Sequence, residues 1–236
     1  MSAKVIGIIG GMGPLASADL YQKITLHTDA RTDQEHPRVV IDSNTAVPNR
    51  TDALLHGGPS PLPEIVKSIR RLESIGAEVL AIPCNTSHGF FDEIQRAAHV
   101  PVLHMINLTR DALKARHITR AGLLATDGTV QTGVYHRSFE GSGIELLTPE
   151  GEDQSAVMGV IYDGVKSGNL NYDTAAFRRC CEALLARGAQ TLILGCTELP
   201  PAFTLYHLDY PIVDPTLELA LGALRFAGCK IKGEMP

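Results

Sequence analysis

Long apolar runs are absent from this chain of 236 residues. None approaches the roughly 18 consecutive apolar residues of a membrane-spanning helix. The run Val5–Ile9 follows Lys4 as the core of a signal peptide would, but Gly10, Gly11 and Gly13 interrupt it at once. A strand followed by a turn is the better interpretation. We therefore expect a cytoplasmic protein with no membrane partner.

Basic runs are also missing. The chain has 21 basic and 26 acidic residues, a net charge of −5, and no cluster of lysine and arginine. This argues against nucleic acid or an anionic membrane as a partner. Hydrophobic residues make up 44% and charged residues 20%, which excludes a disordered chain. Glycine and proline are spread evenly, so no linker or low-complexity tract is expected.

No C-x-x-C motif occurs, and the five cysteines are an odd number. A disulfide framework or a structural zinc site is thus not expected, and reduced thiols are. The nine histidines are scattered and form no ligand set. The glycines that precede Pro14 do not form G-x-G-x-x-G, because Ala16 takes the place of the last glycine, and no phosphate-binding loop with G-K-[ST] exists. The sequence predicts neither a metal nor a cofactor.

Short apolar runs alternate with amphipathic segments along the whole chain. Proline at 14 and 215 suits a first helical turn, and glycine at 76 and 188 suits a helix end. Helical faces are expected from Ile65, Ile69, Leu72 and Ile75, and from similar spacings later in the chain. The alternation predicts an α/β protein with parallel sheets. The expected strands are Val5–Ile9, Val39–Asp42, Val79–Ile82, Val102–Leu103, Ala121–Ala125, Ile144–Leu146, Leu192–Leu194 and Ile212–Val213.

An internal repeat is the more informative feature. Residues 71–86 resemble residues 183–197: in both, a helical pattern ends in Gly-Ala, a strand follows, and a cysteine stands eight residues after the glycine. The starts of the two halves also match, with Gly7 followed six residues later by Gly13, and Gly122 followed by Gly128. The repeat predicts two similar α/β halves.

The repeat gives Cys84 and Cys196 equivalent places, at the carboxyl ends of corresponding strands. Ligands bind at that edge of an open α/β sheet. Residues suited to a helix start follow each cysteine, and a helix N-terminus favours a thiolate. A buried packing role is the alternative for either cysteine alone, but two at equivalent positions favour catalysis. By contrast, Cys180, Cys181 and Cys229 lie in helical patterns and are expected to pack in the core.

Two acid/base groups of one kind suit a reaction that exchanges a proton on both faces of one carbon. One thiolate removes the proton and the opposite thiol returns one to the other face. The site must then stabilise an enolate. Backbone N–H groups in the loops 10–13 and 126–129 are candidate donors.

Three motifs resemble those of the aspartate/glutamate racemase superfamily, in its aspartate racemase branch: Gly10-Gly-Met-Gly-Pro14, Pro83-Cys-Asn-Thr86 and Gly195-Cys-Thr-Glu198. The resemblance covers essentially the whole chain. Glu198 resembles the aspartate branch, because the glutamate branch usually has histidine there.

The resemblance implies two flavodoxin-like α/β domains related by a pseudo-two-fold, with the active site in the cleft between them. The expected bounds are 1–104 plus 211–236 for the first domain and 105–210 for the second. It implies a homodimer, no pyridoxal phosphate and no metal. It also implies that Cys196 serves the L face of the substrate and Cys84 the D face.

Cationic residues at two further motifs match the branch. Arg50 lies in Val47-Pro-Asn-Arg-Thr51 and Lys166 in Ile161-Tyr-Asp-Gly-Val-Lys166. In similar racemases these positions bind the carboxylates of the substrate, and an acidic protein that binds a dicarboxylate must concentrate positive charge locally. Further substrate contacts are expected from Met12, Asn85, Thr86, Thr126, Thr129, Thr197 and Glu198.

The resulting hypothesis is a cofactor-independent racemase of aspartate, with glutamate or other amino acids as further substrates. Maleate isomerisation or malonate decarboxylation on the same scaffold are alternatives. A different class is a Cys–His amide hydrolase that pairs Cys84 with His88, four residues later. A binding protein that takes up dicarboxylates without reaction is the third class.

Overall fold

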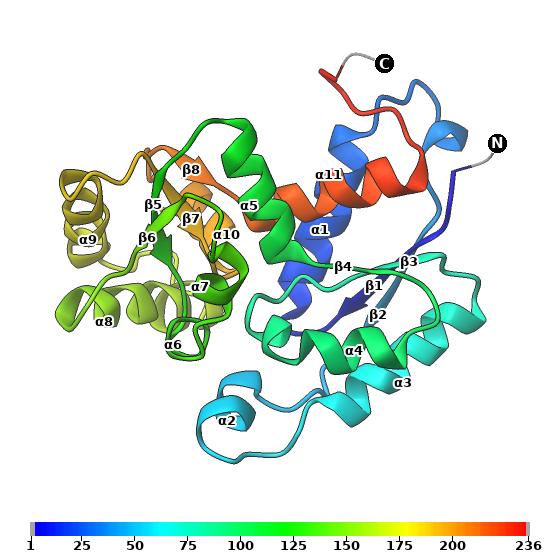
Figure 1. Cartoon of the computed structure of the whole chain (residues 1–236), viewed down its shortest axis with the longest axis horizontal. Coiled ribbons are helices and arrows are strands. Elements are labelled where there is room, and N and C mark those ends of the chain that lie inside the picture. Colours follow the sequence, from blue (N-terminus) through cyan, green and yellow to red (C-terminus); the bar gives the residue numbers. More distant parts are fainter. Residues whose placement is uncertain (1–2, 235–236) are drawn as a thin grey trace. The chain divides into compact units, whose positions relative to one another are not determined.

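The computed structural model describes residues 3–234. The chain divides into two compact units (Figure 1). Unit 1 contains the residues up to Leu108 and those from Thr216 onward, and unit 2 is Thr109–Pro215. None of the helices within residues 3–234 is long and apolar enough to cross a bilayer.

Unit 1 is built on a parallel sheet of four strands in the order β2-β1-β3-β4. Helices cover both of its faces (Figure 1). Alternate residues of β1 and β3 face opposite sides, so that Ile8 joins a core with α1 and α11 while Leu80 joins another with α3 and α4. Its elements are β1 (Ile6–Gly10), α1 (Pro14–His27), η1 (Asp33–Glu35), β2 (Val39–Ser43), α2 (Arg50–Leu55), α3 (Leu62–Ser74), β3 (Val79–Ala81), η2 (Thr86–Phe90), α4 (Phe91–Ala97), β4 (Val102–Leu103), the start of α5 (Met105–Ala115) and nearly all of α11 (Pro215–Ala227).

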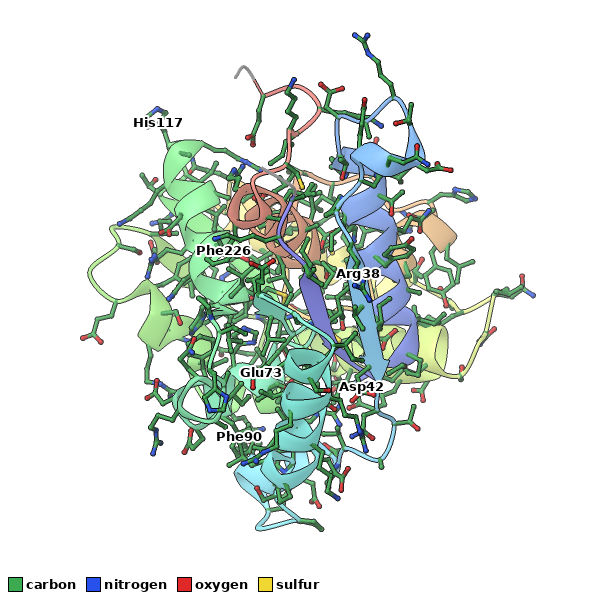
Figure 2. All side chains as sticks on the ribbon, turned by 90° about the vertical axis from the view of Figure 1, so that its right-hand side faces the viewer. Arg38, Asp42, Glu73, Phe90, His117 and Phe226 are labelled. Atoms are coloured by element: carbon green, nitrogen blue, oxygen red, sulfur yellow. The ribbon has the colours of Figure 1, made fainter. Side chains whose placement is uncertain are left out.

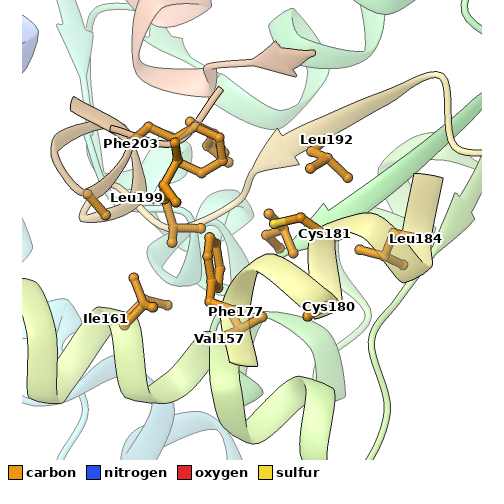
Figure 3. Packing of buried hydrophobic residues seen from close by; sticks show 14 of the residues in the cluster. Val157, Ile161, Phe177, Cys180, Cys181, Leu184, Leu192, Leu199 and Phe203 are labelled. Carbon is orange, nitrogen blue, oxygen red and sulfur yellow. The ribbon is translucent and has the colours of Figure 1, made fainter. Parts of the chain in front are cut away.

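Unit 2 repeats this plan with a parallel sheet in the order β6-β5-β7-β8. Its main core packs β5 and β7 against α8, α9 and α10, with Phe177 and Phe203 in edge-to-face contact (Figure 3). Its elements are β5 (Arg120–Leu124), α6 (Asp127–Gln131), α7 (Val134–Phe139), β6 (Glu145–Leu147), α8 (Glu152–Gly159), the π-helix η3 (Val160–Lys166), α9 (Ala175–Ala186), β7 (Thr191–Leu194), α10 (Leu199–Leu205) and β8 (Ile212–Val213).

The α/β class and all eight expected strands are confirmed, each to within a residue or so at its ends. The helix signals are confirmed too: α1 begins at Pro14 and α11 at Pro215, while Gly76 and Gly188 follow α3 and α9 with φ of 92° and 95°. The expected apolar face of α3 is wrong at one residue, Ile75. Ile75 lies just beyond the helix and is 47% exposed, because the chain has already turned toward β3.

Residues 212–213 belong to unit 2, since β8 pairs with β7 in the second sheet. The expected bounds of the first domain, 1–104 plus 211–236, include these two residues. The chain instead re-enters unit 1 at the start of α11.

The internal repeat extends to individual contacts, which recur at equivalent positions in the two units. After α3 the N–H of Ala77 donates to the carbonyl of Leu72 at 3.0 Å, and after α9 the N–H of Ala189 donates to Leu184 at 3.1 Å. Gly7 of β1 lies against Leu72 and Leu80. At the equivalent place, Gly122 of β5 lies against Leu184 and Leu192 (both labelled in Figure 3). A glycine is required at both places because the helix approaches the strand closely.

Gly7→Ala is predicted to lower the free energy of unfolding of unit 1 by about 1–3 kcal/mol. The new Cβ would lie 2.9 Å from the Cβ of Ala77, which has no rotatable bond with which to move away. Gly122→Ala is the matched comparison, since the two nearest atoms to its new Cβ are side-chain methyl carbons of Leu192 and Leu184, which can rotate away. Urea unfolding should show the larger loss for Gly7→Ala. An equal or smaller loss would contradict the close approach at Ala77.

Candidate active site

The loop after β1 is fixed by a serine of the following helix. The N–H of Gly11 donates to Ser17 Oγ at 3.0 Å, and that hydroxyl donates to the carbonyl of Gly13 at 3.3 Å. Gly11 has φ of 88°, and a Cβ there would lie 2.3 Å from the backbone of Asn44, so only glycine fits. The expectation that this loop supplies free N–H donors is therefore wrong at Gly11, whose N–H is already used by Ser17.

Cys84 lies just after β3, beside the loop that follows β1. Its side chain is 5% exposed and packs in one cluster with Met12 and Val47. Ser87 Oγ lies 3.4 Å from Met12 Sδ, which joins the two loops. In the order β2-β1-β3-β4 the chain leaves β1 toward β2 and leaves β3 toward β4, so the connections that follow these two paired strands run in opposite directions. This is the crevice where open α/β sheets bind ligands.

Asn85 and Thr86 lead from Cys84 into the next helix. Asn85 is buried and precedes η2, which begins at Thr86 and ends at Phe90 (labelled in Figure 2). The expected helix start after Cys84 is confirmed, but it is a short 3-10 helix rather than an α-helix.

His88 is fully engaged by the main chain. Its Nδ1 lies 3.0 Å from the carbonyl oxygen of Cys84, and its Nε2 accepts the N–H of Met105 at 3.0 Å. Burial, aided by the nearby His104, lowers the pKa of His88 to about 3. A histidine whose two nitrogens are both occupied cannot take the proton of the Cys84 thiol. This argues against the Cys–His amide hydrolase.

Arg50, the first residue of α2, reaches back to the loop after β1. Its Nη2 donates to the carbonyl of Met12 at 3.4 Å, and its Nη1 donates to the carbonyls of Val47 and Pro48 at 3.3 and 2.8 Å. Within residues 3–234 its buried Nε has no hydrogen-bond partner. The guanidinium thus lies next to Met12 with donor capacity left for an anion.

Thr126 and Thr129 lie at the equivalent loop of unit 2, after β5. Both are buried, their hydroxyls are 3.2 Å apart, and Thr126 caps α6 by accepting the N–H of Thr129. The N–H of Asp127 lies 3.4 Å from Met158 Sδ. These two N–H groups of the loop are therefore engaged within unit 2, contrary to the expectation that they are free donors.

Cys196 lies after β7, where Gly195 allows the backbone to pass Leu123 and Ala125 closely. Thr197 is buried, and Glu198 occupies the position before α10 without a capping hydrogen bond from its side chain. The expected helix start after the second cysteine is thus confirmed. Cys196 is half-buried and packs against the unit 2 core.

Lys166 and Glu198 form an ion pair beside Cys196, with Nζ 2.8 Å from Oε1. Burial alone would lower the pKa of Lys166, but the hydrogen bond that it donates to Glu198 and its electrostatic attraction to Glu198 and Cys196 outweigh burial and raise the pKa. Lys166 therefore stays charged beside Cys196. Lys166 also lies 5.9 Å from the ring centre of Tyr162.

Tyr135 on α7 is a neighbour of Cys196 that the sequence analysis missed. It is fully buried, and burial together with the charges of Asp214 and Cys196 raises its pKa well above the usual value. The phenol therefore stays protonated beside the thiol. No spacing in the sequence links residues 135 and 196, so only the folded chain reveals this neighbour.

The other three cysteines are unsuited to catalysis, as the sequence indicated. Cys180 and Cys181 are fully buried in the unit 2 core (Figure 3). Burial raises the pKa of Cys180 to about 12 and also raises those of Cys181 and Cys229. Among residues 3–234 no group of three or more His, Cys, Asp or Glu side chains is arranged to hold a metal ion.

The structure therefore brings the expected residues together in two sets. Each set lies within one unit and contains one cysteine, at the carboxyl edge of its sheet, and one cationic side chain. In unit 1 the set is Met12, Arg50, Cys84, Asn85 and Thr86; in unit 2 it is Thr126, Thr129, Lys166, Cys196, Thr197 and Glu198.

Comparison with known proteins identifies the family of this chain. Residues 9–221 match the family described as Asp/Glu/hydantoin racemase, so the chain belongs to that family, whose racemases are isomerases. The structure of Picrophilus torridus aspartate racemase is 33% identical, with a TM-score of 0.82, and the match covers 97% of this chain and 96% of that one.

Two other relatives differ in the substrates that their names give. A broad-specificity amino-acid racemase of Bacillus subtilis is 27% identical over 224 residues, 92% of this chain and 95% of the relative. Glutamate racemase from Francisella tularensis, solved with D-glutamate, is 16% identical with a TM-score of 0.67, covering 97% of this chain and 83% of that one. At this identity the likeness shows the fold alone.

His88 gives a prediction about pH. Its pKa is 6.5 when exposed and about 3 in the fold, so the unfolded chain takes up a proton that the folded chain refuses. The stability it contributes is complete above pH 6.5 and is lost as the pH falls toward 3, at up to about 1.4 kcal/mol per pH unit. Urea unfolding between pH 6.5 and 5 measures how the free energy of unfolding changes with pH. This slope against pH should be shallower for His88→Gln than for the wild type.

His117→Asn is the control for this measurement. His117 lies exposed just after α5 (Figure 2), and asparagine tolerates its φ of 55°. This variant should keep the wild-type slope. A His88→Gln slope equal to that of the wild type would show that His88 is protonated in the fold.

Proposed function

We propose that this protein interconverts L- and D-aspartate without a cofactor, with glutamate as the second candidate substrate. The observation that carries the proposal is the repeated placement of one cysteine after the third strand of each sheet, in two units built to one plan. A reaction with two chemically equal and opposite steps needs such a pair of like groups.

In the proposed reaction one cysteine acts as a thiolate and the other as a thiol. The thiolate takes the α-proton of the substrate and leaves the electron pair on the α-carbon, conjugated with the carboxylate as an enolate. The thiol of the other cysteine then gives its proton to the opposite face. The two cysteines have exchanged protonation states, which suits the enzyme to the reverse reaction.

Arg50 and Lys166 are proposed to hold the two carboxylates and to stabilise the enolate. An Arg50 guanidinium has five N–H donors and a Lys166 ammonium three, so their contacts to Met12 and Glu198 leave donors for an anion. Cationic side chains take this role because the N–H groups of Gly11, Asp127 and Thr129 are bound internally. The proposed Cys196 assignment to the L face and Cys84 to the D face rests on the resemblance, as does the homodimer.

Broader amino-acid racemisation is the strongest alternative, supported by the full-length likeness to the broad-specificity racemase of Bacillus subtilis. Maleate isomerisation would also use two cysteines, but its substrate has no amino group. Incubating L-aspartate in D₂O and following the α-proton signal separates racemisation from maleate isomerisation, and the same assay with other L-amino acids measures the breadth of substrates. Loss of that signal together with appearance of the D isomer supports the racemase, and a persistent signal contradicts it.

Cys84→Ala and Cys196→Ala are each predicted to lower racemisation in both directions by about a thousandfold or more, because each direction needs both groups. Each variant should still exchange the α-proton of one enantiomer with D₂O, since the remaining cysteine can remove a proton and return a deuteron to the same face. The two variants should differ in which enantiomer they exchange. Polarimetry and proton NMR give both readouts.

Cys180→Ala is the control, because its thiol is buried with a raised pKa. It should keep the wild-type rate while losing stability. A variant lacking Cys84 or Cys196 that racemised at the wild-type rate would rule out the two-base mechanism.

Arg50→Ala and Lys166→Ala are predicted to lower kcat/KM for aspartate by about a hundredfold, equivalent to about 2–3 kcal/mol. Alanine lacks the side-chain carboxylate, so its racemisation should fall less in the variant that has lost the contact to that group. Arg50→Lys keeps the charge but loses the planar fork, which separates geometry from charge. If neither variant changes the ratio of kcat/KM for aspartate over alanine, these residues do not recognise the side chain.

A further inference from the structure

His88 joins two main-chain groups that are far apart in the sequence. Its ring spans from the carbonyl of Cys84, one turn earlier, to the N–H of Met105 at the start of α5. The Cys84 residue is itself held by its N–H, which donates to the carbonyl of Ile82 at 2.9 Å. The N–H of Cys84 is thus bound within its own turn, and its carbonyl is linked through His88 to the start of α5.

The chemistry of the two partners defines the tautomer. A backbone N–H can only donate, so Nε2 of His88 must accept from Met105 and cannot carry a proton. The proton is therefore on Nδ1, which donates it to the carbonyl of Cys84. A protonated ring would place an N–H against the N–H of Met105, so only the neutral ring makes both bonds.

Aromatic neighbours fix the plane of this ring. Phe91 stacks on His88 with centroids 5.7 Å apart and planes 10° from parallel, and His104 lies on it at 4.9 Å. The side chain of His88 is 4% exposed. Because the ring is confined in this way, its hydrogen bond restricts the movement of the Cys84 carbonyl.

We propose that His88 is a positioning residue, which sets the place of the Cys84 thiol by clamping its carbonyl to the start of α5. This inference rests on the proposed two-base racemisation, in which the sulfur must approach the α-carbon along one direction. A displacement of about 1 Å at a reacting group costs on the order of a hundredfold in rate.

The clamp belongs to one half of the repeat only. The offset from Cys84 to Cys196 places Pro200 at the position equivalent to His88, and proline offers no side-chain donor or acceptor. Cys196 is instead flanked by Gly195 and the Lys166–Glu198 ion pair. Loss of His88 should therefore disturb one thiol and spare the other, a difference that a general loss of stability does not produce.

Two variants of His88 test its two hydrogen bonds separately, because each variant can keep one bond and lose the other. His88→Asn keeps a short amide whose N–H can reach the carbonyl of Cys84, and His88→Gln keeps a longer amide whose oxygen can accept from Met105. His117→Asn is again the matched control. Circular dichroism and the melting temperature establish the folded fraction of each variant before kinetics are measured.

Deuterium isotope effects with α-deuterated L- and D-aspartate are the decisive readout. Because the equilibrium constant of racemisation is one, kcat/KM must fall equally in both directions and says nothing about which thiol is displaced. We expect a fall of about tenfold or more in His88→Gln. The isotope effect should rise for the enantiomer whose proton Cys84 removes and fall for the other. The enantiomer that Cys196→Ala still exchanges with D₂O is the one that Cys84 serves.

A second measurement does not depend on racemisation. The rates of alkylation of Cys84 and Cys196 by iodoacetamide, followed by mass spectrometry of their peptides, should change about tenfold or more for Cys84 in the His88 variants and less than twofold for Cys196. If the wild type does not racemise aspartate, the proposed function fails while this labelling still tests the clamp. Unchanged labelling of Cys84 together with unchanged isotope effects in both directions would overturn the positioning role.

Discussion

The pairing of the first and third strands in each sheet, β1 with β3 and β5 with β7, is the constraint on which both cysteine sites depend. Parallel strands bring their carboxyl ends to one edge, and the chain leaves the first strand away from the third, so the two following loops diverge there. In unit 1 this places Met12 beside Cys84. The close packing that makes the pairing possible requires a glycine in each first strand, Gly7 and Gly122, because a helix crosses directly above it. The positions of the two cysteines at the carboxyl edges of the sheets therefore depend on the close packing at Gly7 and Gly122.

The two thiols lie in different electrostatic surroundings, although the frameworks match. Cys196 is beside a lysine that stays charged and a tyrosine that stays protonated. Cys84 is beside a histidine that stays neutral and bonds its carbonyl rather than its sulfur. The two surroundings therefore differ in charge, although the strands and the positions of the cysteines repeat.

Buried polar groups at both sites are held in place by partners within their own unit. Glu198 is nearly inaccessible and is paired with the half-buried Lys166, so removal of Lys166 would leave a buried carboxylate without its partner. In unit 1 the hydroxyl of Ser17 binds the glycine loop, and His88 binds two backbone groups. Such satisfied networks restrict the positions of the functional side chains, which a proton transfer over a short distance requires.

The sequence by itself determined the α/β class, the eight strands, the helix ends at Pro14 and Gly76, and the repeat that singled out Cys84 and Cys196. These follow from local periodicity, from the backbone limits of proline and glycine, and from similarity within the chain. Contacts between distant residues were decided only by the tertiary structure. The N–H of Gly11 is used by Ser17, His88 binds Met105 instead of the Cys84 thiol, and Tyr135 lies near Cys196, because each depends on how helices pack on a sheet. No spacing along the chain encodes such packing, since side chains brought together by folding have no fixed separation in sequence.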